Sequence, residues 1–193
     1  MFDRAGKLDW ECTEKPDPRS DSEGISPLMS PPDDPFCQKW SSRGFLPRER
    51  FDAWQGALNA SHLGWTLHKN QRAGFRAEVQ VAKLPDLQVV RCLCQPCSGF
   101  RGRREIAAGG VAYYGLLLLH QGQEEVTVGS RTALLEPGNI LLWDSTESIR
   151  FKLHSPVYKT TVLVPQSRMD DVLPQTQNLV GKAMDWRDRK SVV

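Results

Sequence analysis

The sequence predicts a mainly β protein, a small antiparallel β-barrel or jelly roll with an N-terminal amphipathic helix and a short C-terminal helix. Three observations support this fold class. Short apolar or alternating segments recur between residues 75 and 164, tight-turn sequences separate them, and helical spacing of apolar residues is confined to the flanks. A chain of 193 residues has room for one domain of roughly 130 to 150 ordered residues plus tails.

The N-terminal 40 residues are predicted to be a disordered tail. They are rich in Pro, Ser and Asp, and they offer few apolar side chains to offset the entropy of ordering. An amphipathic helix is expected next, over residues 47–60. Pro47 suits the first helical position, and Phe51, Trp54 and Leu58 follow at spacings of three and four, which places them on one helical face.

A first antiparallel strand pair is expected over residues 75–84 and 87–94, with Pro85-Asp86 as the turn between them. Residues 75–84 alternate apolar with polar side chains. Residues 87–94 also have the composition of a β-strand. Residues 95–110 carry four glycines and three arginines, so they are expected to form a loop with at most a short ordered turn.

The clearest strand pattern lies in residues 113–144. Four strand segments are expected there, at residues 116–119, 126–128, 133–135 and 140–143. Gly129-Ser130 is a two-residue hairpin turn, and Pro137-Gly138-Asn139 combines a fixed φ with residues that accept positive φ. A strand, a tight hairpin and a Pro-Gly turn into an apolar strand are typical of a cupin-like barrel.

Two further strands are expected at residues 149–153 and 157–164, which gives seven or eight strands in all. Apolar residues at 169, 172 and 173 indicate a short helix that Pro174 ends. The chain is therefore divided into a tail over residues 1–40, a cupin-like domain over 41–174, and a linker or tail over 175–193.

Composition excludes several classes of protein. The formal net charge is +2, from 25 basic and 23 acidic residues, so the chain has no electrostatic signature of binding to nucleic acid or an anionic membrane. No segment approaches the ~18 to 20 consecutive apolar residues of a membrane helix, and residues 1–10 are too charged for a signal peptide. A cytoplasmic protein is expected, with its five cysteines reduced.

Enzymatic cupins hold a metal with a His-x-His pair, a Glu and a later His inside the barrel. In this sequence Tyr113, Tyr114 and a leucine run occupy the positions of the first pair, and the later His would fall near Ile149. His120 and His154 remain, without a carboxylate at a suitable spacing. They are expected to be surface or ordinary core residues, and no metal site or cofactor is predicted.

Cys92, Cys94 and Cys97 form a Cys-x-Cys-x-x-Cys motif. Three thiolates suit zinc, an iron–sulfur centre or a redox sensor, but a fourth ligand is missing nearby. The favoured interpretation is that these cysteines act as small hydrophobic residues in the barrel wall.

Arg101, Arg103 and Arg104, with Arg91 before them, form a basic cluster that has the charge to bind an anionic ligand. Basic side chains on a glycine-rich loop are more often simply solvated, and this is the interpretation we favour. The sequence contains no nucleophile elbow, P-loop or dinucleotide fingerprint.

Four segments, in order along the chain, resemble the regulatory domain of AraC/XylS-type transcriptional regulators. They are FLPRERFDAWQGAL, YYGLLLLHQGQEEV, LLEPGNILLWDS and YKTTVLVP. The first looks like the Pro-Arg-Glu-Arg-Phe-x-x-Trp helix that opens this domain in one subgroup, and the resemblance covers about residues 40–185. It implies a cupin-like sensor without metal ligands that binds a small organic effector in its barrel and forms a homodimer through adjoining helices.

The resemblance also implies that DNA is contacted only through a C-terminal domain with two helix-turn-helix motifs, which is absent before Val193. A non-enzymatic ligand-sensing and dimerisation domain, truncated relative to a full regulator, is therefore the leading hypothesis. The alternatives are a small metal-dependent cupin enzyme and a dominant-negative dimerisation partner of a full-length regulator. Tyr113, Tyr114 and Trp143 are candidate pocket residues, but each is more often an ordinary core aromatic, so no catalytic, cofactor or metal residue is predicted.

Overall fold

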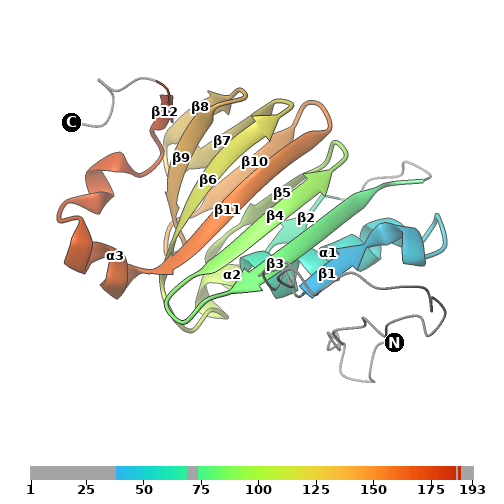
Figure 1. Ribbon diagram of the computed structural model, residues 1–193, viewed down its shortest axis with the longest axis horizontal. Coiled ribbons are helices and arrows are strands. Elements are labelled where there is room, and N and C mark those ends of the chain that lie inside the picture. The colour runs from blue at the N-terminus through green and yellow to red at the C-terminus, as the bar shows by residue number, and fades with distance from the viewer. Residues whose placement is uncertain (1–37, 69–73, 186, 188–193) are drawn as a thin grey trace, which may run out of the picture.

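Two antiparallel β-sheets pack against each other in the computed structural model, which describes residues 38–68, 74–185 and 187 (Figure 1). The larger sheet contains, in spatial order, β1 (Gln38–Ser41), β3 (Ala77–Lys83), β4 (Gln88–Cys94), β11 (Val157–Pro165), β6 (Tyr113–Gln121), β9 (Asn139–Asp144) and β12 (Ala183–Asp185). The smaller sheet contains β2 (Thr66–Leu67), β5 (Ser98–Arg101), β10 (Ile149–Leu153), β7 (Glu124–Val128) and β8 (Arg131–Leu135). The two sheets do not join into one closed barrel, so the described residues form an open, cupin-like jelly roll.

The helical segments are η1 (Ser42–Gly44), α1 (Arg50–His62), α2 (Arg103–Ala107), α3 (Gln166–Val172) and η2 (Thr176–Leu179). In Figure 1, α1 and α3 lie on opposite sides of the strand region, and α2 lies between them. Among the described residues, none of these helices is long and apolar enough to cross a membrane. The mainly β fold with one helix before the strands and a short one after them is therefore confirmed.

The first strand pair predicted from the sequence is β3 with β4. Its register runs from Ala77 opposite Cys94 to Lys83 opposite Gln88. The later strands are also present, and most are longer than the apolar segments that predict them. Backbone pairing explains the difference, because hydrogen bonds to a neighbouring strand continue past the last apolar side chain.

The helix predicted over residues 47–60 is observed as α1. It begins at Arg50 because the preceding residues form a turn of their own, in which the amide of Glu49 donates to the carbonyl of Leu46 at 2.8 Å. The predicted apolar stripe is confirmed, since Trp54 and Leu58 are buried in the core.

The prediction of a loop over residues 95–110 is wrong. Ser98–Arg101 forms β5, which pairs with both β2 and β10, and α2 follows directly. Gly99 explains the misleading signal: a Cβ at this position would lie 2.8 Å from Leu67 Cδ2 and 3.0 Å from Phe151 Cε1. The glycine is required by close packing inside a sheet rather than by a turn.

Both ends of the described chain add strands to the larger sheet. β1 begins at Gln38 and pairs with β3, so the described structure starts within the segment predicted as a tail. Residues 1–37 lie outside the described residues. β12 pairs with β9 inside the segment predicted as linker, because its backbone extends that sheet edge. The predicted domain boundaries stay predictions.

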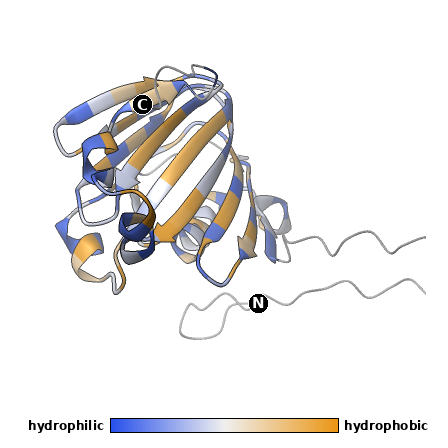
Figure 2. Cartoon of the chain, turned by 60° about the vertical axis from the view of Figure 1, so that its left-hand side comes forward, coloured by the Kyte–Doolittle hydropathy of each residue, from blue (hydrophilic) through white to orange (hydrophobic). Residues whose placement is uncertain are grey.

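The core lies between the two sheets, where strand alternation directs apolar side chains inward. In β10, Ile149, Phe151 and Leu153 are buried while Arg150 and Lys152 are exposed. Figure 2 shows the same alternation of apolar and polar residues along the strands. Each large apolar side chain buried in this way contributes about 1.5 to 3 kcal/mol to folding.

Gly115 leaves room for the side chain of Trp143, which is one of the largest in the core. It lies opposite Trp143 in the β6–β9 register, and a Cβ at Gly115 would fall 2.0 Å from Trp143 Cε2. The indole therefore lies over a backbone without a side chain. Glycine is required at position 115 because any side chain there would overlap the indole of Trp143.

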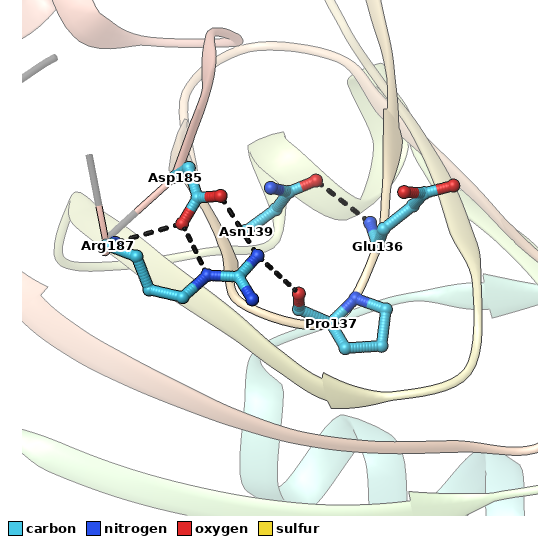
Figure 3. A network of polar contacts seen from close by, with 5 residues as sticks. All are labelled: Glu136, Pro137, Asn139, Asp185 and Arg187. Atoms are coloured by element: carbon cyan, nitrogen blue, oxygen red, sulfur yellow. Dashed lines mark hydrogen bonds and ion pairs between the residues drawn. The ribbon is translucent and has the colours of Figure 1, made fainter.

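The predicted Pro-Gly turn is confirmed at residues 137–139. Gly138 has a φ of +95°, and the Asn139 side chain accepts a hydrogen bond from the amide of Glu136 at 2.9 Å. Figure 3 shows that the last described residue also meets this turn: Arg187 donates to the carbonyl of Pro137 at 3.3 Å and pairs with Asp185 at 2.9 Å. Asp185 and Arg187 thereby contact the turn between β8 and β9.

Candidate functional site

A small cavity lies inside the jelly roll, between the two sheets and under α1. Its volume is about 40 Å³. Both sheets and α1 contribute to its wall, which consists of Trp54, Leu58, His62, Trp65, Cys92, Cys94, Cys97, Leu117, Glu124, Val126, Trp143, Ile149, Phe151, Leu153, Lys159 and Thr161. Most of these side chains are apolar or aromatic, and a few polar groups converge among them. This composition is typical of a small-molecule site.

A buried ion pair is the main polar feature of the cavity wall. Lys159 Nζ on β11 donates to both carboxylate oxygens of Glu124 on β7, at 2.7 and 2.9 Å. Glu124 is 1% exposed, and the ammonium also lies 5.4 Å from the centre of the Phe151 ring. Burial lowers the pKa of Lys159, but the carboxylate of Glu124 and the nearby thiols together outweigh burial and raise it. Lys159 is therefore held as the ammonium, and its contact with Glu124 bridges the two sheets.

Strand alternation in the sequence carries a signal for this pair. On β11, Lys159 is in phase with the buried Val157 and Thr161, and on β7 Glu124 is in phase with the buried Val126. Strand alternation therefore directs both charges inward. A charge at an inward position is costly unless it is paired, so an inward Lys and an inward Glu predict each other.

His62 brings a second polar group to the cavity from the last turn of α1. It is 5% exposed, and its Nδ1 lies 2.8 Å from the hydroxyl of Ser61. Its Nε2 has no hydrogen-bond partner among the described residues. Burial, with the charge of Lys159, lowers the pKa of His62 to about 3, so the ring is neutral near pH 7. In the sequence, His62 follows Leu58 by four residues, and this helical spacing indicates that His62 shares the inward face of α1.

The three cysteines predicted to be buried wall residues do line the cavity as free, buried thiols. The sulfurs of Cys94 and Cys97 are 3.7 Å apart. Burial and thiol hydrogen bonds raise the pKa of Cys94, whereas the hydrogen bond from Cys94, with a contribution from Lys159, lowers the pKa of Cys97. Among the residues that the structure describes, no group of three or more His, Cys, Asp or Glu side chains is arranged to hold a metal ion.

Aromatic rings form the apolar part of the wall. Trp65 packs edge to face against Trp143, with centroids 5.9 Å apart, and against Phe151 at 5.5 Å. Its indole nitrogen donates to the carbonyl of His62 at 2.8 Å, which ties this cluster to the end of α1. All three rings line the cavity.

Of the three aromatic residues considered as pocket candidates, Trp143 lines the cavity and the two tyrosines do not. Tyr113 lines two depressions on the outer surface instead. Tyr114 is buried elsewhere, and its hydroxyl accepts a hydrogen bond from Gln177 at 2.9 Å. Gln177 also donates to Asp144 at 2.8 Å, so Tyr114 helps to hold η2 on the larger sheet.

His120 and His154, the two candidate metal ligands in the sequence, have different partners. His120 bonds to Thr160 at 2.8 Å and packs on the ring of Tyr158. His154 lies 3.7 Å from Glu125 at a partly exposed position. Neither residue lines the central cavity.

The arginine cluster is divided by the fold. Arg101 is buried, and its guanidinium donates to the carbonyls of Ser145 at 3.1 Å and Gly64 at 2.8 Å. It therefore fastens β5 to two turns, and burial lowers its pKa. Arg91, Arg103 and Arg104 are exposed. The four side chains do not converge on one anion site.

Two larger depressions open on the outer surface, with volumes of about 300 and 610 Å³. One lies beside the turn between β3 and β4, and the other beside α2. The depression beside α2 includes the buried Arg101, but its guanidinium is already bound to two backbone carbonyls, and neither depression lies between the two sheets. The central cavity is therefore the better candidate site, although it is smaller.

The open jelly roll and its enclosed, largely apolar cavity define a cupin-like domain of the kind that binds small molecules. The family model for the AraC-binding-like domain matches residues 54–190, and the chain belongs to this family. Membership points to a regulatory rather than an enzymatic role. A comparison with curated proteins found no match.

A comparison with solved structures found several matches. The AraC-like transcriptional activator CuxR shares 18% identity over 69% of this chain and 49% of its own, with a TM-score of 0.60. The cupin domain of Schizosaccharomyces pombe Cnp3 shares 10% identity over 61% of this chain and 77% of its own, with a TM-score of 0.40. Ectoine synthase from P. lautus shares 14% identity over 50% and 71%, with a TM-score of 0.37. This chain thus matches about half the length of CuxR.

Proposed function

We propose that the domain senses a small organic effector in its central cavity and regulates transcription through an attached or associated DNA-binding domain. The observation that carries this proposal is the cavity wall itself. It combines aromatic rings with the buried Lys159–Glu124 pair and the unpartnered Nε2 of His62. Replacing a buried ion pair with apolar residues of similar volume is often neutral or stabilising, so stability alone does not account for the pair.

Effector binding would act by a shift between two arrangements of the elements around the cavity. The cavity has room for little more than a few small atoms at about 40 Å³, so an effector favours a state in which part of the wall has moved. α1 is the candidate for this movement, because Trp54, Leu58 and His62 form its contribution to the wall. The change would reach the DNA-binding domain through the segments that flank the jelly roll. The protein would act in the reducing cytoplasm.

Homodimerisation is also part of the proposal. On and just after α3, Val172 is 82% exposed and Leu173 is 43% exposed, which leaves apolar side chains in solvent on a surface helix. A second copy of the domain packed against α3 would cover them. In such a dimer the two output domains would take positions that depend on the state of both cavities.

A metal-dependent enzyme is the less favoured alternative, on the chemistry of the donor set. His62 is the one histidine among the described residues that line the cavity. The carboxylate in the same lining, Glu124, is already bound to Lys159.

The proposal is tested by measuring the binding of a panel of small organic compounds to the purified protein, by thermal shift and calorimetry. Val126→Phe would fill the cavity, because Val126 lines it. Thr127→Phe is the matched control, since Thr127 is the next residue on β7 and bonds Thr132 at 2.9 Å outside the cavity.

We expect at least one compound to bind the wild-type protein and the Thr127→Phe variant but not the folded Val126→Phe variant. Binding that survives Val126→Phe, or a panel without any binder, would contradict a central effector site.

A further inference from the structure

The hydrogen bonds around Ser61 determine the tautomer of His62. The Ser61 hydroxyl oxygen lies 2.8 Å from the carbonyl oxygen of Ala57 and 2.8 Å from His62 Nδ1. A carbonyl only accepts, so two oxygens at this distance require the single hydroxyl proton between them. The hydroxyl therefore accepts from Nδ1, which carries the ring proton. Nε2 is left as an acceptor with a free lone pair.

That lone pair lies in the interior and has no donor within the described part of the chain. A buried polar atom without a partner is unfavourable, and such atoms are rare in folded proteins. Nε2 is on the opposite side of the ring from Ser61, and His62 lines the cavity. A cavity occupant with a hydroxyl or N–H group would supply the missing hydrogen bond.

The charges of the cavity favour a neutral occupant. Both oxygens of Glu124 are bound by Lys159, and the ammonium also faces the ring of Phe151. An anion that bound Lys159 would leave the carboxylate of Glu124 buried and unpaired, and a cation that bound Glu124 would do the same to Lys159. The pair is therefore complete without a ligand.

The remaining wall favours a small aromatic occupant. Trp65, Trp143 and Phe151 present rings in edge-to-face contact, and an added ring would extend this packing. The cavity of about 40 Å³ is smaller than the ~150 Å³ that holds benzene in an engineered protein cavity, so even one ring requires the wall to move. Compounds with several rings fit poorly.

We propose that the cavity recognises a neutral, single-ring aromatic compound whose hydroxyl or N–H group donates a hydrogen bond to Nε2 of His62. This inference rests on the proposed function and specifies the chemical class of the effector. The ring is held by the aromatic wall, and His62 selects for the donor.

The test compares four probes of similar size by calorimetry: phenol, toluene, anisole and benzoate. Phenol has the donor, toluene lacks it, anisole has the oxygen without the proton, and benzoate is charged. Phenol makes one hydrogen bond to the buried Nε2 that toluene and anisole cannot make, so phenol should bind about tenfold more tightly than either. Benzoate should bind most weakly.

Two variants of His62 assign the preference to its Nε2. His62→Leu removes the acceptor, so the ratio of phenol to toluene affinity should fall to about twofold or less, whereas His62→Gln keeps an amide oxygen and should retain part of it. The ¹⁵N resonance of Nε2 in the wild-type protein gives a second readout that does not depend on a variant folding. It should move when phenol is added and stay in place with toluene.

Equal affinities for phenol and toluene, a phenol preference that survives His62→Leu, or tightest binding of benzoate would overturn the inference. In any of these cases, a probe that binds the wild-type protein but not Val126→Phe would show that the central cavity is an effector site. Only the predicted chemical class would then be wrong. If neither these probes nor any compound of the wider panel binds, the proposed function fails as well.

Discussion

Lys159 and Glu124 are costly residues to bury, since each loses its hydration and recovers that loss only from the other. Their short, two-oxygen contact at 2.7 and 2.9 Å recovers much of it. Removing one partner therefore differs from removing both. The former leaves a buried charge, and the latter leaves an ordinary apolar core.

The Glu124→Gln variant should lower the free energy of unfolding by about 3 kcal/mol, because Lys159 is left without its counter-ion. The double variant Glu124→Leu with Lys159→Met should recover most of this loss. Glu125→Gln is the matched control on the same strand, at a partly exposed position beside His154, and it should change stability by less than about 1 kcal/mol. Urea unfolding measures all four proteins, and a single variant as stable as wild type would contradict the energetic role of the pair.

His62 makes the stability of the domain depend on pH. Its folded pKa of about 3 lies below its ordinary value of 6.5, so between these values the unfolded chain binds the proton and the folded protein does not. Stability contributed by the neutral ring is therefore present above about pH 6.5 and is lost as the pH falls toward 3, at up to about 1.4 kcal/mol per pH unit.

The His62→Gln variant should lose this part of the slope between pH 6 and pH 4, because the amide does not titrate. Urea unfolding at several pH values gives both curves, and their difference removes the contribution of the other titrating groups. Parallel curves for the two proteins would show that His62 is protonated in the folded state or does not contribute.

At the scale of elements, β6 and β9 fit together because one of two opposed residues has no side chain. Gly115→Ala should destabilise the domain by about 1 to 3 kcal/mol, since the added methyl group overlaps the indole of Trp143. Gly44→Ala is the control, because a Cβ there meets nothing within 4 Å. The measurements are urea unfolding and the near-ultraviolet circular dichroism of the tryptophans. Equal stabilities of the two variants would contradict this packing.

The elements also show where the sequence was informative. Strands with clear alternation and the turns at Gly129 and Gly138 were predicted, because short-range side-chain and φ preferences fix them. β5 was missed because its glycine and arginine have long-range causes: Gly99 lies against Leu67, and Arg101 satisfies the carbonyl of Gly64. Neither partner is near in sequence, so local composition resembled a loop.

At the scale of the whole molecule, the exposed apolar residues of α3 predict association. The wild-type protein should have twice its chain mass of 21.8 kDa in light scattering at high micromolar concentration. Val172→Asp should shift it to the monomer by burying a charge in the interface. Val111→Asp, at a position that is 63% exposed elsewhere, should leave the mass unchanged. A wild-type protein that is monomeric, or a dimer unaffected by Val172→Asp, would contradict the proposed dimer.

The candidate site was less predictable than the fold. The sequence predicts Trp143 and the three cysteines as pocket or wall residues, but it does not predict Lys159, Glu124 or His62 as site residues. These three come from β11, β7 and α1, and the periodicity of each segment directs its residue inward without specifying what it meets there. Their meaning depends on the sheets bringing them to one cavity.

The sequence by itself determined the mainly β fold, most of its strands and turns, and the resemblance to a regulatory domain, because these depend on side-chain periodicity and on motifs that are local in the chain. Only the tertiary structure decided which residues face one another across the interior. The ion pair between the sheets and the lone pair of His62 exist only there, since burial and the absence of a partner are properties of the packed molecule.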